Sequence, residues 1–95
     1  MTLKFAQYIL EGHEPKEADL MTWAKWFEHA DRQVARDEIG DTLVSTVFIG
    51  LGIGFEPVLF ETCIFKGDET VERYRCKTWD EALEQHAHAL GSLAT

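Results

Sequence analysis

The chain has 95 residues, of which 45% are hydrophobic and 12% aromatic, and its net charge is −8 with the histidines neutral. This composition is rich enough in apolar side chains for a packed core and argues against general disorder, and a chain this short has room for one domain. The acidic excess repels phosphate backbones and anionic lipid, so we expect no direct binding to nucleic acid or to a membrane.

Two features bear on the cellular compartment. No apolar run approaches the roughly 18 residues that a membrane span needs, and the start MTLKFAQYIL is too short and too polar for a secretory leader. Cys63 and Cys76 lack metal-ligand spacing, and we expect two reduced thiols in strands, with a bridge between them as the alternative. We therefore predict a cytoplasmic protein.

The N-terminal third predicts a strand, a loop and a helix. Phe5 to Leu10 is a short apolar stretch that fits an edge strand. Glu11 to Asp19 is expected to be a turn, because Gly12 breaks the pattern and Pro15 disfavours helix in the residue before it.

The helix is expected from Leu20 to Ala30, with Asp19 as its N-cap. Apolar residues at helical spacing predict its buried face: Leu20, Trp23, Ala24 and Phe27. Trp26 lies beside this stripe, where it either widens the core face or anchors a binding partner.

The rest of the chain is organised around Thr42 to Lys66, which contains two runs rich in β-branched and aromatic residues. A strand over Arg32 to Ile39 leads into it through the turn dipeptide Gly40-Asp41. The connection GLGIG is expected to supply positive φ angles rather than a phosphate-binding loop, because no helix and no Lys follow it. Pro57 to Lys66 returns as the second strand of the pair.

The first run of this pair is apolar on both sides, since Leu43, Val47 and Ile49 point one way and Val44 and Phe48 the other. With helices on one face, the other face stays open unless a partner covers it. We expect that open face to carry Val44, Phe48 or their alternates.

Charged side chains are expected at the rim of the open face. Glu61 lies within an apolar run and is expected to form an ion pair with Arg73 or Arg75 of the next strand, the alternative being an acid or base. The partner-binding candidates are accordingly Trp26, Phe48, Glu61, Arg73 and Arg75.

A strand over Val71 to Cys76 precedes the C-terminal helix. Thr78 and Glu81 have the spacing of a capping box that opens this helix, and Gly91 is placed to end it. The side expected to be buried carries Trp79, Ala82, Leu83, His86 and Leu90. We expect His86 to be a hydrogen-bonded boundary residue, the alternative being a metal ligand or general base.

These elements predict an α+β fold of order β-α-β-β-β-β-α. Its core would be one twisted antiparallel sheet of about four to five strands with both helices on one face. We assign no catalytic, cofactor-binding or metal-binding residue.

Three stretches carry a resemblance to a known family: STVFIGLGIGF at 45–55, PVLFETCIF at 57–65 and RYRCKTWDEALEQH at 73–86. With TWAKWFEHADRQVA at 22–35, they resemble small uncharacterised proteins encoded by bacteriophages and prophages, which read STVFLGLDHxF, LFETMVF and YxTWxEAxxGH. The resemblance implies a phage or prophage origin and no known activity.

The chain departs from this family pattern in three places. Gly52-Ile53 replaces the family's Asp-His, the loop before Pro57 is shorter, and Gln85 stands where Gly precedes the histidine. If the Asp and His were functional in relatives, this chain has lost them, which argues against an enzyme.

The leading functional hypothesis is therefore a non-catalytic accessory protein that binds a host or defence protein, in one form by mimicking nucleic acid with its carboxylates. One alternative is a metal-dependent or acid/base enzyme using Glu61 and His86, which requires both groups in one cleft. The other is a dimeric structural or virion accessory protein.

Overall fold

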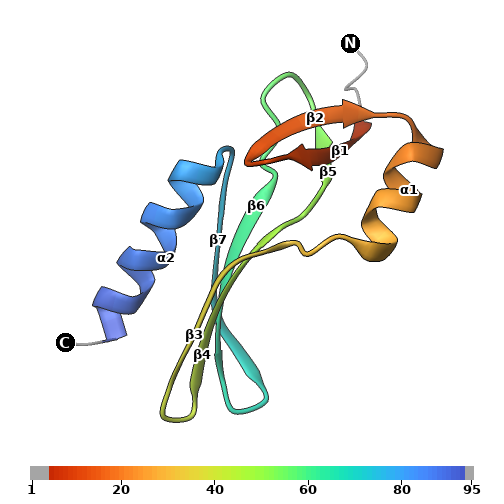
Figure 1. The fold of residues 1–95 in the computed structure, drawn as a ribbon. Coiled ribbons are helices and arrows are strands. Elements are labelled where there is room, and N and C mark those ends of the chain that lie inside the picture. The colour runs from red at the N-terminus through yellow and green to blue at the C-terminus, as the bar shows by residue number, and fades with distance from the viewer. Residues whose placement is uncertain (1–4, 94–95) are drawn as a thin grey trace.

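The computed structural model describes residues 5–93, which form two antiparallel sheets and two helices (Figure 1). Residues 1–4, part of the segment judged too polar for a leader, lie outside the described residues. The small sheet, in spatial order, consists of β2 (Glu14–Ala18), β1 (Phe5–Glu11) and β5 (Leu51–Ile53). The large sheet consists of β3 (Gln33–Ile39), β4 (Thr42–Phe48), β6 (Phe60–Lys66) and β7 (Glu69–Cys76). The helices are α1 (Leu20–His29) and α2 (Trp79–Leu93).

The α+β class is confirmed, whereas the predicted element order and the single sheet are wrong. The stretch Glu11 to Asp19, expected to be a loop, contains β2, which pairs with β1 as a hairpin. Pro15 is tolerated because β2 is an edge strand, where a missing N–H need not break the ladder. The glycine-rich connection holds β5, which pairs with the other edge of β1.

Two glycines let the chain pass from the large sheet into the small one. Gly50 has a φ of +79°, and its carbonyl accepts a 2.9 Å hydrogen bond from the N–H of Tyr8. Gly52 lies so close to Pro57 that an added Cβ would collide with the proline ring. These glycines therefore allow the backbone conformation and the close packing that this connection requires.

The large sheet confirms that the two apolar runs pair. β4 and β6 are antiparallel, with a register that runs from Thr42↔Lys66 to Phe48↔Phe60. The side chains beneath α2 form the core, in which Val44, Phe48 and Phe60 are completely buried and Ile64 is nearly so. The buried face of α2 carries Ala82 and Ala89, small residues that allow the helix to approach the strands closely.

Both helices begin with the predicted caps. The carboxylate of Asp19 accepts the N–H of Thr22 at 2.8 Å. At α2, the Thr78 hydroxyl accepts the N–H of Glu81, and the Glu81 carboxylate accepts the N–H of Thr78, each at 3.1 Å. α2 runs through Gly91 to Leu93, so the prediction that Gly91 ends the helix is wrong.

The prediction that both helices cover one face of one sheet is also wrong. α2 packs against all four strands of the large sheet, while the main contacts of α1 are with β1. Figure 1 shows α2 beside the large sheet and α1 on the opposite side, below the small sheet. A helix of ten residues is only about 15 Å long, and the missed small sheet supplies the surface against which it packs.

The predicted buried stripe of α1 is only partly correct. Leu20 is 60% exposed and Ala24 is also exposed, whereas Trp23, Trp26 and Phe27 are half-buried.

No helix within residues 5–93 combines the length and apolarity required to cross a membrane.

Candidate functional site

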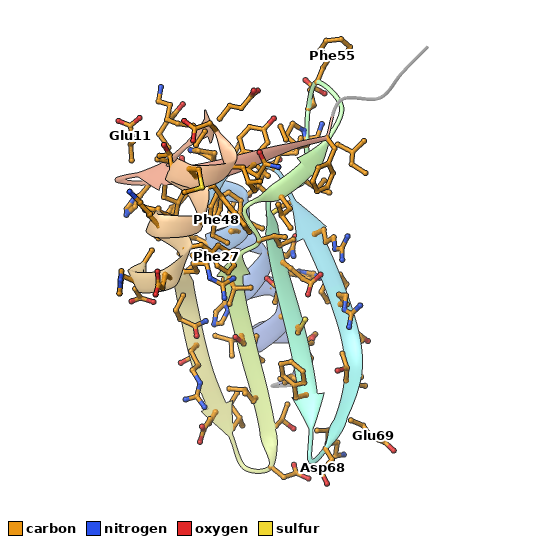
Figure 2. The ribbon with its side chains drawn as sticks, turned by 90° about the vertical axis from the view of Figure 1, so that its right-hand side faces the viewer. Glu11, Phe27, Phe48, Phe55, Asp68 and Glu69 are labelled. Carbon is orange, nitrogen blue, oxygen red and sulfur yellow. The ribbon has the colours of Figure 1, made fainter. Side chains whose placement is uncertain are left out.

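Among residues 5–93, no helix lies along one face of the large sheet, and we call this face the open face. Because successive side chains in a strand point to opposite sides, the open-face residues alternate with those packed against α2. Figure 2 shows this face toward the viewer, with α2 behind the strands. Its residues are Gln33, Arg36, Glu38, Leu43, Ser45, Val47, Glu61, Cys63, Phe65, Thr70, Arg73 and Arg75.

The assignment of Phe48 and Val44 to the open face is wrong. Both side chains are completely buried, on the side of the sheet that α2 covers. The apolar side chains on the open face are their alternates Leu43 and Val47, together with Phe65, and all three are partly exposed. Phe48 is therefore a core residue rather than a surface for a partner.

Glu61 forms the predicted ion pairs in the open face. Its Oε2 lies 2.7 Å from Nε of Arg75, and its Oε1 lies 3.8 Å from Nε of Arg73. The thiol of Cys63 donates a further hydrogen bond to Oε1 at 3.1 Å. The antiparallel register places Glu61 opposite Arg75, which is why adjacent strands bring the charges together.

The pKa values of this cluster follow from its contacts. Partial burial alone would raise the pKa of Glu61, but the hydrogen bonds from Cys63 and Arg75 and the charges of both arginines outweigh burial and lower the pKa below 4.5. Burial and the neighbouring Glu61 carboxylate raise the pKa of the Cys63 thiol. Glu61 therefore stays ionised at neutral pH, which suits an ion-pairing role better than proton transfer.

The two cysteines lie on opposite faces of the large sheet. Cys63 contacts Glu61 in the open face, whereas Cys76 packs against the core cluster beneath α2. Burial, and secondarily the charge of Glu81, raises the pKa of Cys76 to about 11. Both thiols are free, and this geometry does not provide the bridge considered as the alternative.

A cavity of about 200 Å³ opens at the junction of the two sheets, beside Arg75. Apart from Arg75 its lining is glycine and aliphatic or aromatic side chains: Phe5, Ile49, Leu51, Gly52, Ile53 and Val58. Phe5 and Ile53 are both more than half exposed. The sequence did not predict this cavity, because its lining comes from three separate segments brought together by the small sheet.

Trp26 lies apart from the open-face cluster. Its ring makes an edge-to-face contact with Phe48, with centroids 5.7 Å apart, and the residue is half-buried. This matches the reading that Trp26 widens the core face, since it packs against the core cluster.

A chain of hydrogen bonds connects α2 to the large sheet. Nδ1 of His86 lies 2.7 Å from the Thr46 hydroxyl, which lies 2.6 Å from the Thr62 hydroxyl. Nε2 of His86 lies 2.8 Å from a carboxylate oxygen of Asp37 on β3. His86 is thus the hydrogen-bonded residue that was expected, although at 4% exposure it is buried rather than at the boundary.

The order hydroxyl, imidazole, carboxylate is also that of a nucleophilic relay. Such a relay needs a hydroxyl that a substrate can reach, and both Thr46 and Thr62 have no exposed surface. Because every member of the chain has a partner, the arrangement satisfies buried polar groups and fixes α2 on the sheet. The signal available in the sequence was the pair of threonines at inward positions of two paired strands.

Glu61 and His86 do not converge. Thr62, next to Glu61 in β6, points toward α2 and joins the His86 chain, so Glu61 points to the opposite side of the sheet. The shared cleft that the enzyme alternative requires is therefore missing for this pair.

A larger cavity, of about 480 Å³, lies where the β1–β2 turn meets the start of α2. It is lined by three carboxylates, those of Glu11, Glu14 and Asp80, and by the ring of His13, which stacks on Trp79 with centroids 3.8 Å apart. Among residues 5–93, no three His, Cys, Asp or Glu side chains are arranged as a metal site. Much of the acidic character of the chain thus lies away from the open face.

Comparison of the chain with protein-family models, curated proteins and solved structures gives no match. The resemblance to phage and prophage proteins therefore stays a prediction that rests on the motifs.

Proposed function

We propose that this chain is a small, non-catalytic accessory protein of phage or prophage type that acts by binding another protein through its open face. The observation that carries the proposal is the uncovered sheet face itself. Leu43, Val47 and Phe65 stand partly exposed on its two central strands, β4 and β6, and Glu61 of β6 forms ion pairs with Arg73 and Arg75 of the edge strand β7. Partly exposed apolar side chains with charged groups at the edge are common in protein interfaces.

The enzyme alternative receives less support. Its two proposed groups, Glu61 and His86, lie on opposite sides of the large sheet, and the relay-like hydroxyl of Thr46 is buried. The open face also presents an ionised carboxylate held by two guanidinium groups, which gives Glu61 no proton to donate near neutral pH and makes it a weaker base. Protein binding through the open face needs only that Glu61 and the arginines be ionised and accessible, and it does not require Glu61 and His86 to meet in one cleft.

Site-specific photo-crosslinking in bacterial cells tests the proposal. A photoreactive residue at Val47 samples the open face, and the same residue at Leu83, which is 44% exposed on α2, is the matched control. We expect a discrete adduct with one cellular protein from position 47 and none from position 83. Equal adducts from both positions, or none from position 47, would contradict the proposal. An adduct of twice the chain's mass would instead indicate the homodimer.

A further inference from the structure

The cavity beside Arg75 extends the open face onto the small sheet. Val47 and Ile49 lie two residues apart along β4 and its continuation, and Ile49 lines the cavity. Val58, which is 40% exposed, also lines the cavity. At about 200 Å³ the cavity is smaller than the roughly 300–1,000 Å³ typical of small-molecule sites. It has the size to take a single apolar side chain from a larger partner.

Arg75 retains most of its hydrogen-bonding capacity. A guanidinium group has five N–H donors, and in the described structure Nε of Arg75 is the donor that meets Glu61. The side chain is 53% exposed, and that of Arg73 is 57% exposed. Glu61 therefore holds the two arginines while their side chains remain accessible to an incoming carboxylate.

The charge of the open face is opposite in sign to that of the chain. Its charged side chains are the guanidinium groups of Arg36, Arg73 and Arg75 and the carboxylates of Glu38 and Glu61. Three cations against two anions leave this face at +1, while the whole chain carries −8. A second copy of the same face would carry the same sign, whereas an acidic partner would complement it.

We propose that the cavity and the Arg73–Arg75 pair form one subsite that accepts an apolar side chain flanked by acidic residues in a protein partner. This inference rests on the proposed function and names the partner's chemistry. The partner's apolar side chain fills the cavity between Phe5, Ile53 and Val58, and its carboxylate accepts hydrogen bonds from the free donors of Arg75. Specificity comes from charge, because a basic segment with the same apolar residue meets two guanidinium groups.

Two synthetic peptides test this subsite. The probes are acetyl-Glu-Glu-Leu-Phe-Glu-Glu-amide and its counterpart with four Lys in place of Glu, each titrated against the ¹⁵N-labelled chain by NMR. We expect the acidic peptide to shift the amides of residues 49–56, of Val58 and of Arg75, and the basic peptide to bind at least fivefold more weakly. Equal binding of both peptides, shifts confined to other surfaces, or no binding of the acidic peptide at millimolar concentration overturns the inference.

Variants separate the two halves of the subsite. Arg75→Glu is expected to weaken the acidic peptide at least fivefold, and Arg75→Gln, which adds no negative charge beside Glu61, to weaken it by a smaller factor. Val58→Ser removes apolar surface and is expected to weaken both peptides. Lys25→Glu makes the same charge change on α1 and is expected to alter binding less than twofold. Unchanged binding in Arg75→Glu overturns the inference.

The outcome is distinguishable from failure of the proposed function. If the position-47 crosslink persists unchanged in Arg75→Glu, the open face binds a protein but the acidic-partner subsite is wrong. If the crosslink is missing in the unmodified background, the proposed function itself fails.

Discussion

The two faces of the large sheet are built from the same four strands, yet they differ in what they bury and how they are held. The face under α2 contains Val44 and Phe48, which are fully buried, and a chain of hydrogen bonds that runs from Thr62 to Asp37. The open face has partly exposed apolar side chains and ion pairs whose cationic members reach solvent. A strand that is apolar on both sides can thus bury one face in the core and leave the other face partly exposed to solvent.

The largest expected effect is a loss of stability when a phenylalanine on the covered face is replaced by alanine, compared with the same replacement on the open face. Phe48→Ala should destabilise the fold by about 3–5 kcal/mol, because it deletes a fully buried aromatic ring from the core. Phe65→Ala, on the open face, should cost much less because its side chain is already partly exposed. Urea unfolding of both variants measures the difference. Similar losses at the two positions would show that the open face is covered.

The second prediction concerns the polar chain on the covered face. Thr46→Val should cost about 1–3 kcal/mol, since it leaves the Thr62 hydroxyl and Nδ1 of His86 without their shared partner. The double variant Thr46→Val/Thr62→Val should lose less stability than the two single variants lose together, because the Thr62 hydroxyl has already lost its hydrogen bond in Thr46→Val. A double-mutant cycle by chemical denaturation gives the coupling, and strict additivity would argue against the hydrogen-bond chain.

The third prediction concerns the point where the open face passes into the small sheet. Gly52→Ala should destabilise by about 1–3 kcal/mol, because the new Cβ meets the rigid ring of Pro57. Gly91→Ala is the control, since nothing lies near that position in α2, and it should be neutral or stabilising by up to about 1 kcal/mol. Thermal melts that ranked the two variants in the opposite order would contradict the close approach of the proline loop.

The smallest effect is the pH dependence of the open-face ion pairs. The folded-state pKa of Glu61 lies below its ordinary value of 4.5, so the stabilisation is fully present above pH 4.5 and is lost as the pH falls through the folded-state pKa. Because the arginines are half-exposed, the loss should stay below about 1 kcal/mol. Comparing acid titrations of stability for Glu61→Gln and the parent isolates this contribution, with Glu69→Gln on β7 as control. If the stability of the parent and of Glu61→Gln fell in parallel below pH 4.5, Glu61 would make no contribution to the pH dependence.

Local patterns predicted what depends on neighbours in sequence. The capping box at Thr78, the pairing of β4 with β6, and the contact of Glu61 with Arg75 each follow from residues in one element or in adjacent strands. The pairing of β1 with β5 was not predictable in this way, because it joins segments more than forty residues apart and β5 has only three residues.

The prediction placed Val44 and Phe48 on the wrong face of the large sheet for a similar physical reason. Leu43 and Val47 are as apolar as Val44 and Phe48, so alternation alone cannot decide which set α2 covers. The choice depends on the small residues of α2 and on His86, whose partners lie on the Val44 side. The cavity beside Arg75 was missed for the same reason, since Phe5 and Val58 meet only after the small sheet has formed.

The position of α2 in the chain has a consequence for biosynthesis. Residues 79–93 follow all seven described strands, so the helix that covers the core face of the large sheet is the last of these elements to leave the ribosome, and the sheet lacks its cover until the helix has docked. During that interval Val44, Phe48 and Ile64 face solvent on one side while Leu43 and Val47 do so on the other. A chain truncated before Trp79 would therefore expose apolar surface on both sides of one sheet, the kind of species that chaperones retain and that aggregates when they do not.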